Sequence, residues 1–90
     1  MTVQHGNVVG TFTATGVSDS VFVSDGRLKL NFAGTATVQL EVWSAQANAF
    51  ISTSDTFTST TSQNIKGRYD EYRVQCTAHD GADVNYEIMQ

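Results

Sequence analysis

Apolar and polar residues alternate along most of this chain, most regularly in its last third. Positions 72, 74, 76 and 78 are apolar or small, and positions 84, 86 and 88 repeat the pattern after a segment that contains Asp80 and Gly81. A period of two is typical of a strand with one buried face. The pattern predicts an antiparallel terminal hairpin with four inward side chains, those of Val74, Cys76, Val84 and Tyr86.

Shorter alternating segments precede this hairpin, at residues 8–14, 20–24, 27–32 and 38–43. Asp25-Gly26 is the strongest turn signal between them, because this pair accepts the positive φ angles of tight hairpins. Residues 33–35 predict a second turn, and residues 44–49, which break the alternation, predict a loop.

Residues 52–62 contain nine Ser or Thr in eleven positions. Such composition is compatible with a flexible linker. We favour a strand and a turn, because Thr suits the pleated backbone and Phe57 offers a side chain for the core.

These segments predict an all-β fold. There are about seven to nine short strands with turns at regular spacing, no proline and no helical periodicity. We expect one antiparallel β-sandwich or jelly-roll-like domain over residues 8–90, preceded by a polar N-terminal arm (residues 1–7).

Composition narrows the range of partners. The chain has 90 residues and a net charge of −4, and nucleic-acid binding needs a basic surface that its five scattered cations do not supply. No stretch approaches the roughly 18 apolar residues of a membrane span. Cys76 is the one cysteine, so no internal disulfide can form, which fits synthesis in a reducing cytoplasm.

Candidate residues for chemistry are few. His79 and Asp80 could join a serine in a hydrolytic triad, but no Gly-x-Ser-x-Gly motif is present, and we interpret both as turn residues. Cys76 falls on the inward face and is expected to be a core residue. The carboxylates of residues 70, 71, 80 and 83 could bind calcium if their loops met, yet they match no ordered motif. We expect no enzyme activity, no metal and no cofactor.

Interaction residues are the better candidates. By alternation Trp43 shares the polar face of its strand, where it would be an interface anchor, or a strand end turns it back over the core; the sequence leaves both open. Arg27 and Lys29 lie on a polar face, and Tyr69 precedes the last long strand. The arm has no apolar periodicity, so order there would come from a partner; its candidate contact residues are Met1, Thr2, Val3, Gln4 and His5.

Residues 20–90 resemble a group of small virion proteins of tailed bacteriophages. Those proteins have a Val-x-Leu-Glu strand, a loop with an aromatic residue, and a Tyr-Arg-x-x-Cys-Thr-Ala strand that turns through glycine into the last strand. The matching segments here are 38–41, Gly67, 72–78, Gly81 and 84–86. Such relatives often carry a Gly- and Asp-rich loop before an aromatic residue, whereas this chain has residues 44–49 and then Phe50. Contacts that this loop makes in those proteins are therefore not assigned to this chain.

The resemblance implies a non-enzymatic virion component, made in the host cytoplasm and assembled into the particle. A decoration (cement) protein that binds the capsid lattice in many copies fits best. Its partners would be the major capsid protein or another virion protein, and other copies of itself on the particle. The alternative is a tail or head-fibre adhesion module that binds host-surface glycans, with Trp43 or Tyr69 as a stacking platform. A small hydrolase or metal-dependent enzyme is the third reading.

Overall fold

The computed structural model describes residues 7–89, with the side chains of residues 66–69 excepted. Within this range the chain is all-β, as predicted, and forms seven antiparallel strands of one sheet. No helix long and apolar enough to cross a membrane occurs among these residues. The strands are β1 (Val8–Phe12), β2 (Gly16–Val17), β3 (Val21–Phe32), β4 (Ala36–Ser44), β5 (Ala49–Phe57), β6 (Thr61–His79) and β7 (Val84–Met89).

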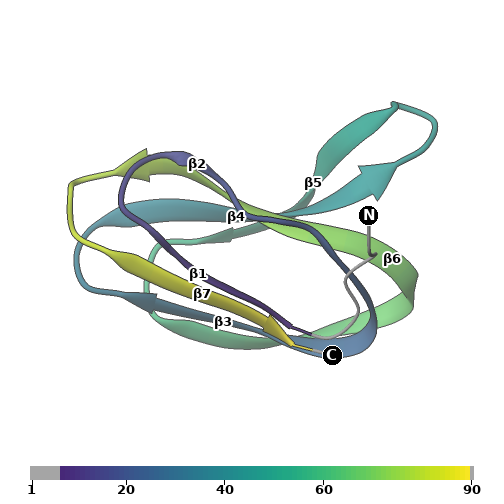
Figure 1. The fold of residues 1–90 in the computed structure, drawn as a ribbon, viewed down its shortest axis with the longest axis horizontal. Coiled ribbons are helices and arrows are strands. Elements are labelled where there is room, and N and C mark those ends of the chain that lie inside the picture. Colours follow the sequence, from purple (N-terminus) through teal and green to yellow (C-terminus); the bar gives the residue numbers. More distant parts are fainter. Residues whose placement is uncertain (1–6, 90) are drawn as a thin grey trace.

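The sheet folds over on itself into two layers (Figure 1). Its strand order is β1-β7-β3-β6-β4-β5, and β2 also pairs with β6. The 19-residue β6 belongs to both layers: residues 61–72 pair with β3, and residues 72–79 pair with β4. A single long strand therefore joins the two halves of the sandwich.

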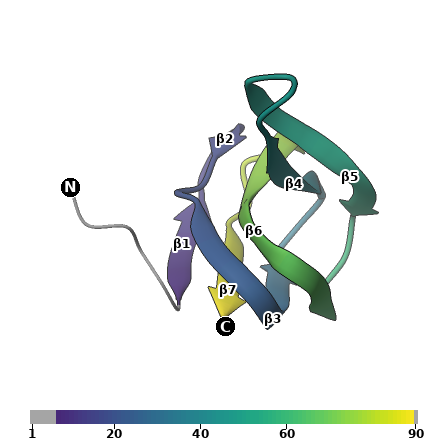
Figure 2. The same ribbon diagram turned by 90° about the vertical axis from the view of Figure 1, so that its right-hand side faces the viewer.

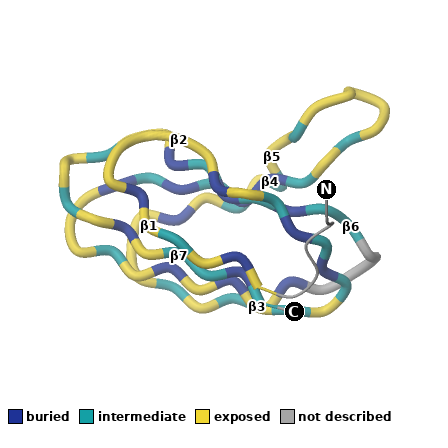
Figure 3. Tube along the Cα trace, in the orientation of Figure 1, coloured by how far each residue is buried: buried dark blue, intermediate teal, exposed yellow. Residues whose placement is uncertain are grey.

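The core lies between the layers and consists of the alternate apolar residues that the sequence predicts (Figure 3). Val74, Cys76 and Val84 are buried, whereas Tyr86 is half-buried and packs against Phe12 with ring centroids 4.6 Å apart. Phe57 is buried at the end of β5, and β6 begins at Thr61, so residues 52–62 are strand and turn rather than linker. The other buried apolar residues are Val8, Phe12, Val21, Val23, Leu28, Leu30, Ala36, Val38, Leu40, Ile65, Tyr72 and Ile88.

The predicted terminal hairpin is wrong in its pairing. The inward faces of β6 and β7 are as expected, but β7 pairs with β1 and β3, while the facing part of β6 pairs with β4 and β2. The segment 80–83 crosses from one layer to the other (Figure 1). Both layers turn their apolar sides toward the same core, so alternation fixes the face of a strand but not its neighbour.

The predicted Asp25-Gly26 turn is also wrong, because β3 runs through it and joins the two strands expected at 20–24 and 27–32. The register against β6 shifts between Val23 and Asp25, a bulge that bends β3 instead of reversing it. A Cβ atom on Gly26 would lie 2.1 Å from the Met89 carbonyl oxygen. Glycine is therefore needed here for close backbone approach rather than for a turn.

The other predicted connections are confirmed with small changes of boundary. The chain turns at residues 33–35 and 45–48, and the latter turn contains Asn48 in a left-handed conformation at φ 53°. The first strand is shorter than expected and ends at Phe12.

Candidate functional site

Trp43 lies on the β4–β5 hairpin, which projects from the body of the sandwich (Figure 1). It pairs across the hairpin with Phe50, and the two rings meet edge to face with centroids 5.3 Å apart. The Trp43 side chain is 38% exposed. Of the two readings that the sequence left open, the outward one is correct.

A salt bridge at the base of the hairpin supports this aromatic pair. The Arg73 guanidinium on β6 lies 4.2 Å from the centre of the Phe50 ring, a cation–π contact. Arg73 Nε donates a hydrogen bond to Glu41 Oε1 at 2.7 Å, and Glu41 is only 6% exposed. We call Glu41, Arg73, Phe50 and Trp43 the hairpin cluster. Its members fix one another, so the exposed indole is held in place before any partner arrives.

Sequence reasoning missed Glu41 and Arg73 as a pair. They lie 32 residues apart in the chain and are direct neighbours across β4 and β6. Alternation places Glu41 on the polar face of its strand, so nothing in the local sequence indicated that this carboxylate is buried and needs a cation beside it.

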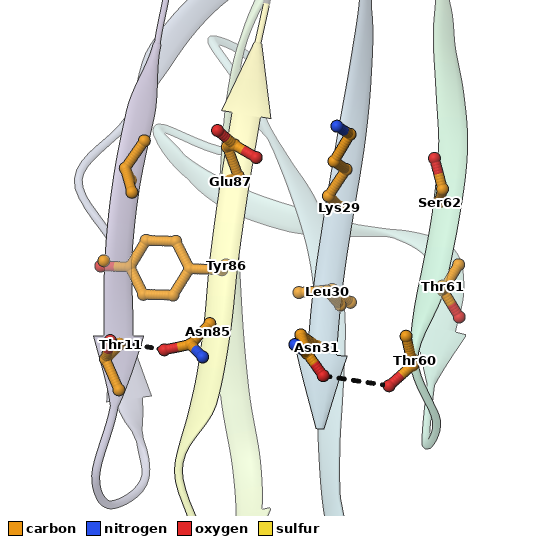
Figure 4. A pocket seen from close by; sticks show the side chains of 12 residues that line it. Thr11, Lys29, Leu30, Asn31, Thr60, Thr61, Ser62, Asn85, Tyr86 and Glu87 are labelled. Carbon is orange, nitrogen blue, oxygen red and sulfur yellow. Dashed lines mark hydrogen bonds between the residues drawn. The ribbon is translucent and has the colours of Figure 1, made fainter. Parts of the chain in front are cut away.

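A second surface covers the outer face of β1, β7, β3 and the start of β6 (Figure 4). It is a shallow hollow of about 620 Å³. Side chains that neighbour one another across the strands form two rows there. One row contains Thr11, Asn85, Asn31 and Thr60, and the other contains Val9, Glu87, Lys29 and Ser62.

Hydrogen bonds order the first of these rows. Thr11 Oγ1 donates to Asn85 Oδ1 at 2.8 Å, and Thr60 Oγ1 donates to Asn31 Oδ1 at 3.4 Å. The second row places Lys29 beside Glu87 of β7. The hollow, which we call the polar face, thus offers amides and hydroxyls around one cation and one carboxylate.

Arg27 and Lys29 are exposed neighbours on β3, as expected of a polar strand face. Lys29 borders the polar face, and Arg27 lies opposite Met89 of β7 and Asn64 of β6. The projecting hairpin extends from the other layer (Figure 1). The fold therefore brings the two cations together but does not place them beside Trp43.

His79 hydrogen-bonds to backbone groups on both sides of its ring. The Gly81 amide donates to His79 Nδ1 at 3.0 Å, which leaves Nε2 to donate to the Phe12 carbonyl oxygen at 3.1 Å. Gly81 has a φ of 102°, a conformation open to glycine. These bonds tie the crossing segment 80–83 to the end of β1, a structural role.

Asp80 links the turn at residues 33–35 to the crossing segment 80–83. Its Oδ2 accepts a hydrogen bond from the Thr35 amide at 2.8 Å, and its Oδ1 accepts one from the Ala82 amide at 2.9 Å. The Ala82 and Thr35 donors favour the charged form and lower the pKa of the Asp80 carboxyl. Asp80 and His79 therefore serve as turn residues in this fold.

Cys76 is buried, and its thiol donates to the Ala78 carbonyl oxygen at 3.3 Å. Burial raises the pKa of this thiol and disfavours the reactive thiolate. Glu71, one of the possible calcium ligands, accepts a hydrogen bond from the Ser20 hydroxyl. Across residues 7–89 no group of three or more His, Cys, Asp or Glu side chains is placed to hold a metal ion.

Some predicted contact residues lie outside the described part of the chain: Met1, Thr2, Val3, Gln4 and His5, together with the side chain of Tyr69. In comparisons with known proteins, no family model, no curated protein and no solved structure matched the chain. The function is therefore argued from the hairpin cluster and the polar face.

Proposed function

We propose that this chain is a non-enzymatic virion structural protein, a capsid decoration protein that binds the capsid lattice in many copies through its hairpin cluster. The observation that carries the proposal is the exposed Trp43 ring, which packs edge to face on Phe50, while the Phe50 ring in turn contacts Arg73 of the Arg73–Glu41 salt bridge. Tryptophan and arginine are the residues most enriched among the anchors of protein interfaces. Because the hairpin projects from the body, it can enter a depression on a partner while the sandwich remains outside (Figure 1).

The chemistry of the cluster suggests the complementary surface. An apolar pocket of the major capsid protein would receive the Trp43 ring, with a hydrogen-bond acceptor for the indole N–H at its rim. The Ser- and Thr-rich strand β5 flanks the ring and carries few charges that would lose water on contact. A domain of this size has modest stability alone and gains apparent stability from any partner that binds only the folded state.

The resemblance to tailed-phage virion proteins supports a particle component over a free enzyme. The bonding of His79, Asp80 and Cys76 supports the same choice, since backbone groups in the described fold already engage each of them.

Counting the chain in purified virions tests the proposal. Quantitative mass spectrometry should find on the order of hundreds of copies per particle, because a symmetric lattice repeats each docking site many times. Absence of the chain from the particle would overturn a virion role. A count of tens or fewer would favour the adhesion alternative.

The polar face favours glycan binding as the second candidate function. Its amides and hydroxyls are the groups that hydrogen-bond sugar hydroxyls, and Asn31 and Asn85 point from neighbouring strands into the same hollow (Figure 4). Trp43 does not line this hollow, so this site would bind a sugar without the stacking platform of Trp43 or Tyr69 that the sequence suggested. Replacing both asparagines by alanine should then abolish binding to host-surface glycans, whereas Trp43→Ala should leave it intact. A glycan array with both variants separates this function from capsid decoration.

A further inference from the structure

Two of the four large apolar side chains that are exposed in the described fold lie on the hairpin, and the other two lie on β1 and β2. Trp43 and Ile51, the latter 45% exposed, belong to the hairpin. Val9 and Val17 are 67% and 50% exposed, and they lie on β1 and β2. These two strands occupy the side of the sandwich opposite β5 (Figure 2). The second pair is not explained by docking through Trp43.

β1 is an unprotected sheet edge. It is the last strand in the sheet order, and among the described strands it pairs with β7 alone. Its five residues contain no charge and no proline, and its register against β7 has no shift. Natural edge strands are usually protected from pairing by charges, prolines or bulges. β1 has none of these.

The opposite edge, β5, has two of these protections. Its pairing with β4 shifts between Gln39 and Glu41, where residues 53–55 of β5 lie opposite the single residue Leu40 of β4 and form a bulge. Within the bulge Ser54 has a φ of 75°, and Asp55 adds a charge. Thr53 Oγ1 donates to the Leu40 carbonyl oxygen at 3.0 Å and holds the bulge in place. The β5 edge is therefore protected against pairing with another strand, whereas the β1 edge is not.

Tyr86 keeps β1 well supported from inside. A Cβ atom on Gly10 would lie 2.3 Å from the Tyr86 hydroxyl oxygen, so the Tyr86 ring occupies the space that a side chain would need. The same ring packs against Phe12 at the end of β1. β1 is thus held as a regular strand, and its outer edge pairs with no other strand of the described fold. At the end of β1, the Phe12 carbonyl oxygen accepts the hydrogen bond from His79.

We propose that β1 pairs with β1 of a second copy of this chain, antiparallel and across a two-fold axis. A two-fold axis reverses the direction of a strand, so one strand can pair with its own copy. The chain carries a net charge of −4, yet β1 is uncharged, so two copies meet at this edge without repulsion between charges on the paired strands. Pairing would join the two β1-containing layers into one continuous sheet and cover part of each Val9.

A five-residue seam is a small interface, so we expect association in the micromolar range. Sedimentation velocity of the isolated wild-type protein, from about 1 to about 500 µM, should show a monomer that converts to a dimer. Val9→Lys places two cations at the seam and should weaken the dimer about tenfold or more. The matched control is Ile51→Lys, on the protected edge, which should dimerise like the wild type. Circular dichroism should find both variants folded, since both side chains are exposed.

A wild-type protein that stays monomeric over the whole range would overturn the proposal. So would a Val9→Lys variant that dimerises as tightly as the wild type, or an Ile51→Lys variant that alone loses the dimer. The outcome does not depend on capsid docking, because the protein is measured alone.

Amide hydrogen exchange locates the seam independently. Amides of β1 that face away from β7 should exchange more slowly as the protein concentration rises, and those of β5 should not change. Concentration-dependent protection on β5 instead of β1 would contradict the proposed pairing.

Discussion

The projecting hairpin and the β1 edge expose apolar residues in different ways. The hairpin presents side chains, with Trp43 fixed on Phe50 and the neighbouring edge of β5 closed by a bulge. β1 presents backbone, with one large exposed side chain, Val9, and a regular register. Side chains select a partner by the shape of a pocket, whereas a strand edge accepts another strand through main-chain hydrogen bonds. One small sandwich can therefore keep a surface for a different protein and a separate surface for its own copies.

The two surfaces lie apart in the molecule: the β4–β5 turn is at the top of Figure 2, and β1 is at its lower left. A copy bound at β1 would leave the hairpin free, and a partner at the hairpin would leave β1 free. Each surface can therefore be disabled by mutation without loss of the other.

The largest expected effect is on the core that both surfaces share. Val74 has no exposed area, and Val74→Asp would bury a carboxylate without a partner. We expect the free energy of unfolding to fall by about 3–5 kcal/mol, with loss of both surfaces together. Urea unfolding measures this, with Gln75→Asp on the outward side of the same strand as control, expected within about 1 kcal/mol of wild type. An unchanged transition for Val74→Asp would contradict the assigned face.

A smaller and local effect is expected at β1. Gly10→Ala forces the Tyr86 ring away from its position and from Phe12, which should lower the free energy of unfolding by about 1–3 kcal/mol. Gly16→Ala is the matched control, because a Cβ atom there would meet nothing within 4 Å. Thermal unfolding should separate the two variants. Equal melting temperatures would mean that Tyr86 does not support β1 as described.

The smallest effect is expected at Asp80, which links the 33–35 turn to the crossing segment 80–83, away from both surfaces. The hydrogen bonds from the Ala82 and Thr35 amides lower the pKa of Asp80 in the folded state. Their contribution to stability is fully present at a pH above the unfolded pKa, and it is lost as the pH falls through the folded pKa. Asp80→Ala should therefore melt below wild type at neutral pH, and the difference should disappear in acid, once the pH lies below the folded pKa of Asp80. Melting curves across this range test the sign. A difference that persists in acid would show that the charge of Asp80 is not responsible.

Much of the fold could be predicted because the alternation of apolar and polar residues along a strand indicates which side chains are buried. Val74, Cys76 and Val84 are inward as their positions indicate, and Phe57 distinguishes a strand from a linker in a segment rich in Ser and Thr. The partners of the strands could not be predicted, because β6 and β7 face one core from different layers. At Gly26 the local preference for a turn is overridden, because β3 pairs with β6 on both sides of this residue and the Gly26 backbone packs closely against Met89.

The candidate site was predictable only in part. Trp43 stood out as an aromatic residue on a polar face, but its direction depended on the pairing with Phe50. The Glu41–Arg73 bridge depends on the register between β4 and β6, which local sequence does not contain. The difference between the two sheet edges also required the strand order, since neither β1 nor β5 carries a sequence mark of its position.

Titration of undecorated capsids with wild-type protein and with Trp43→Ala measures how much of the binding depends on the hairpin cluster. Trp43 is an exposed side chain, so the variant should fold and dimerise as the wild type does. Its capsid affinity should fall by about 30-fold or more, as for an interface anchor, whereas Ile51→Ala on the other face of the hairpin should bind within severalfold of wild type. A Trp43→Ala variant that decorates capsids as tightly as the wild type would contradict docking through the hairpin cluster.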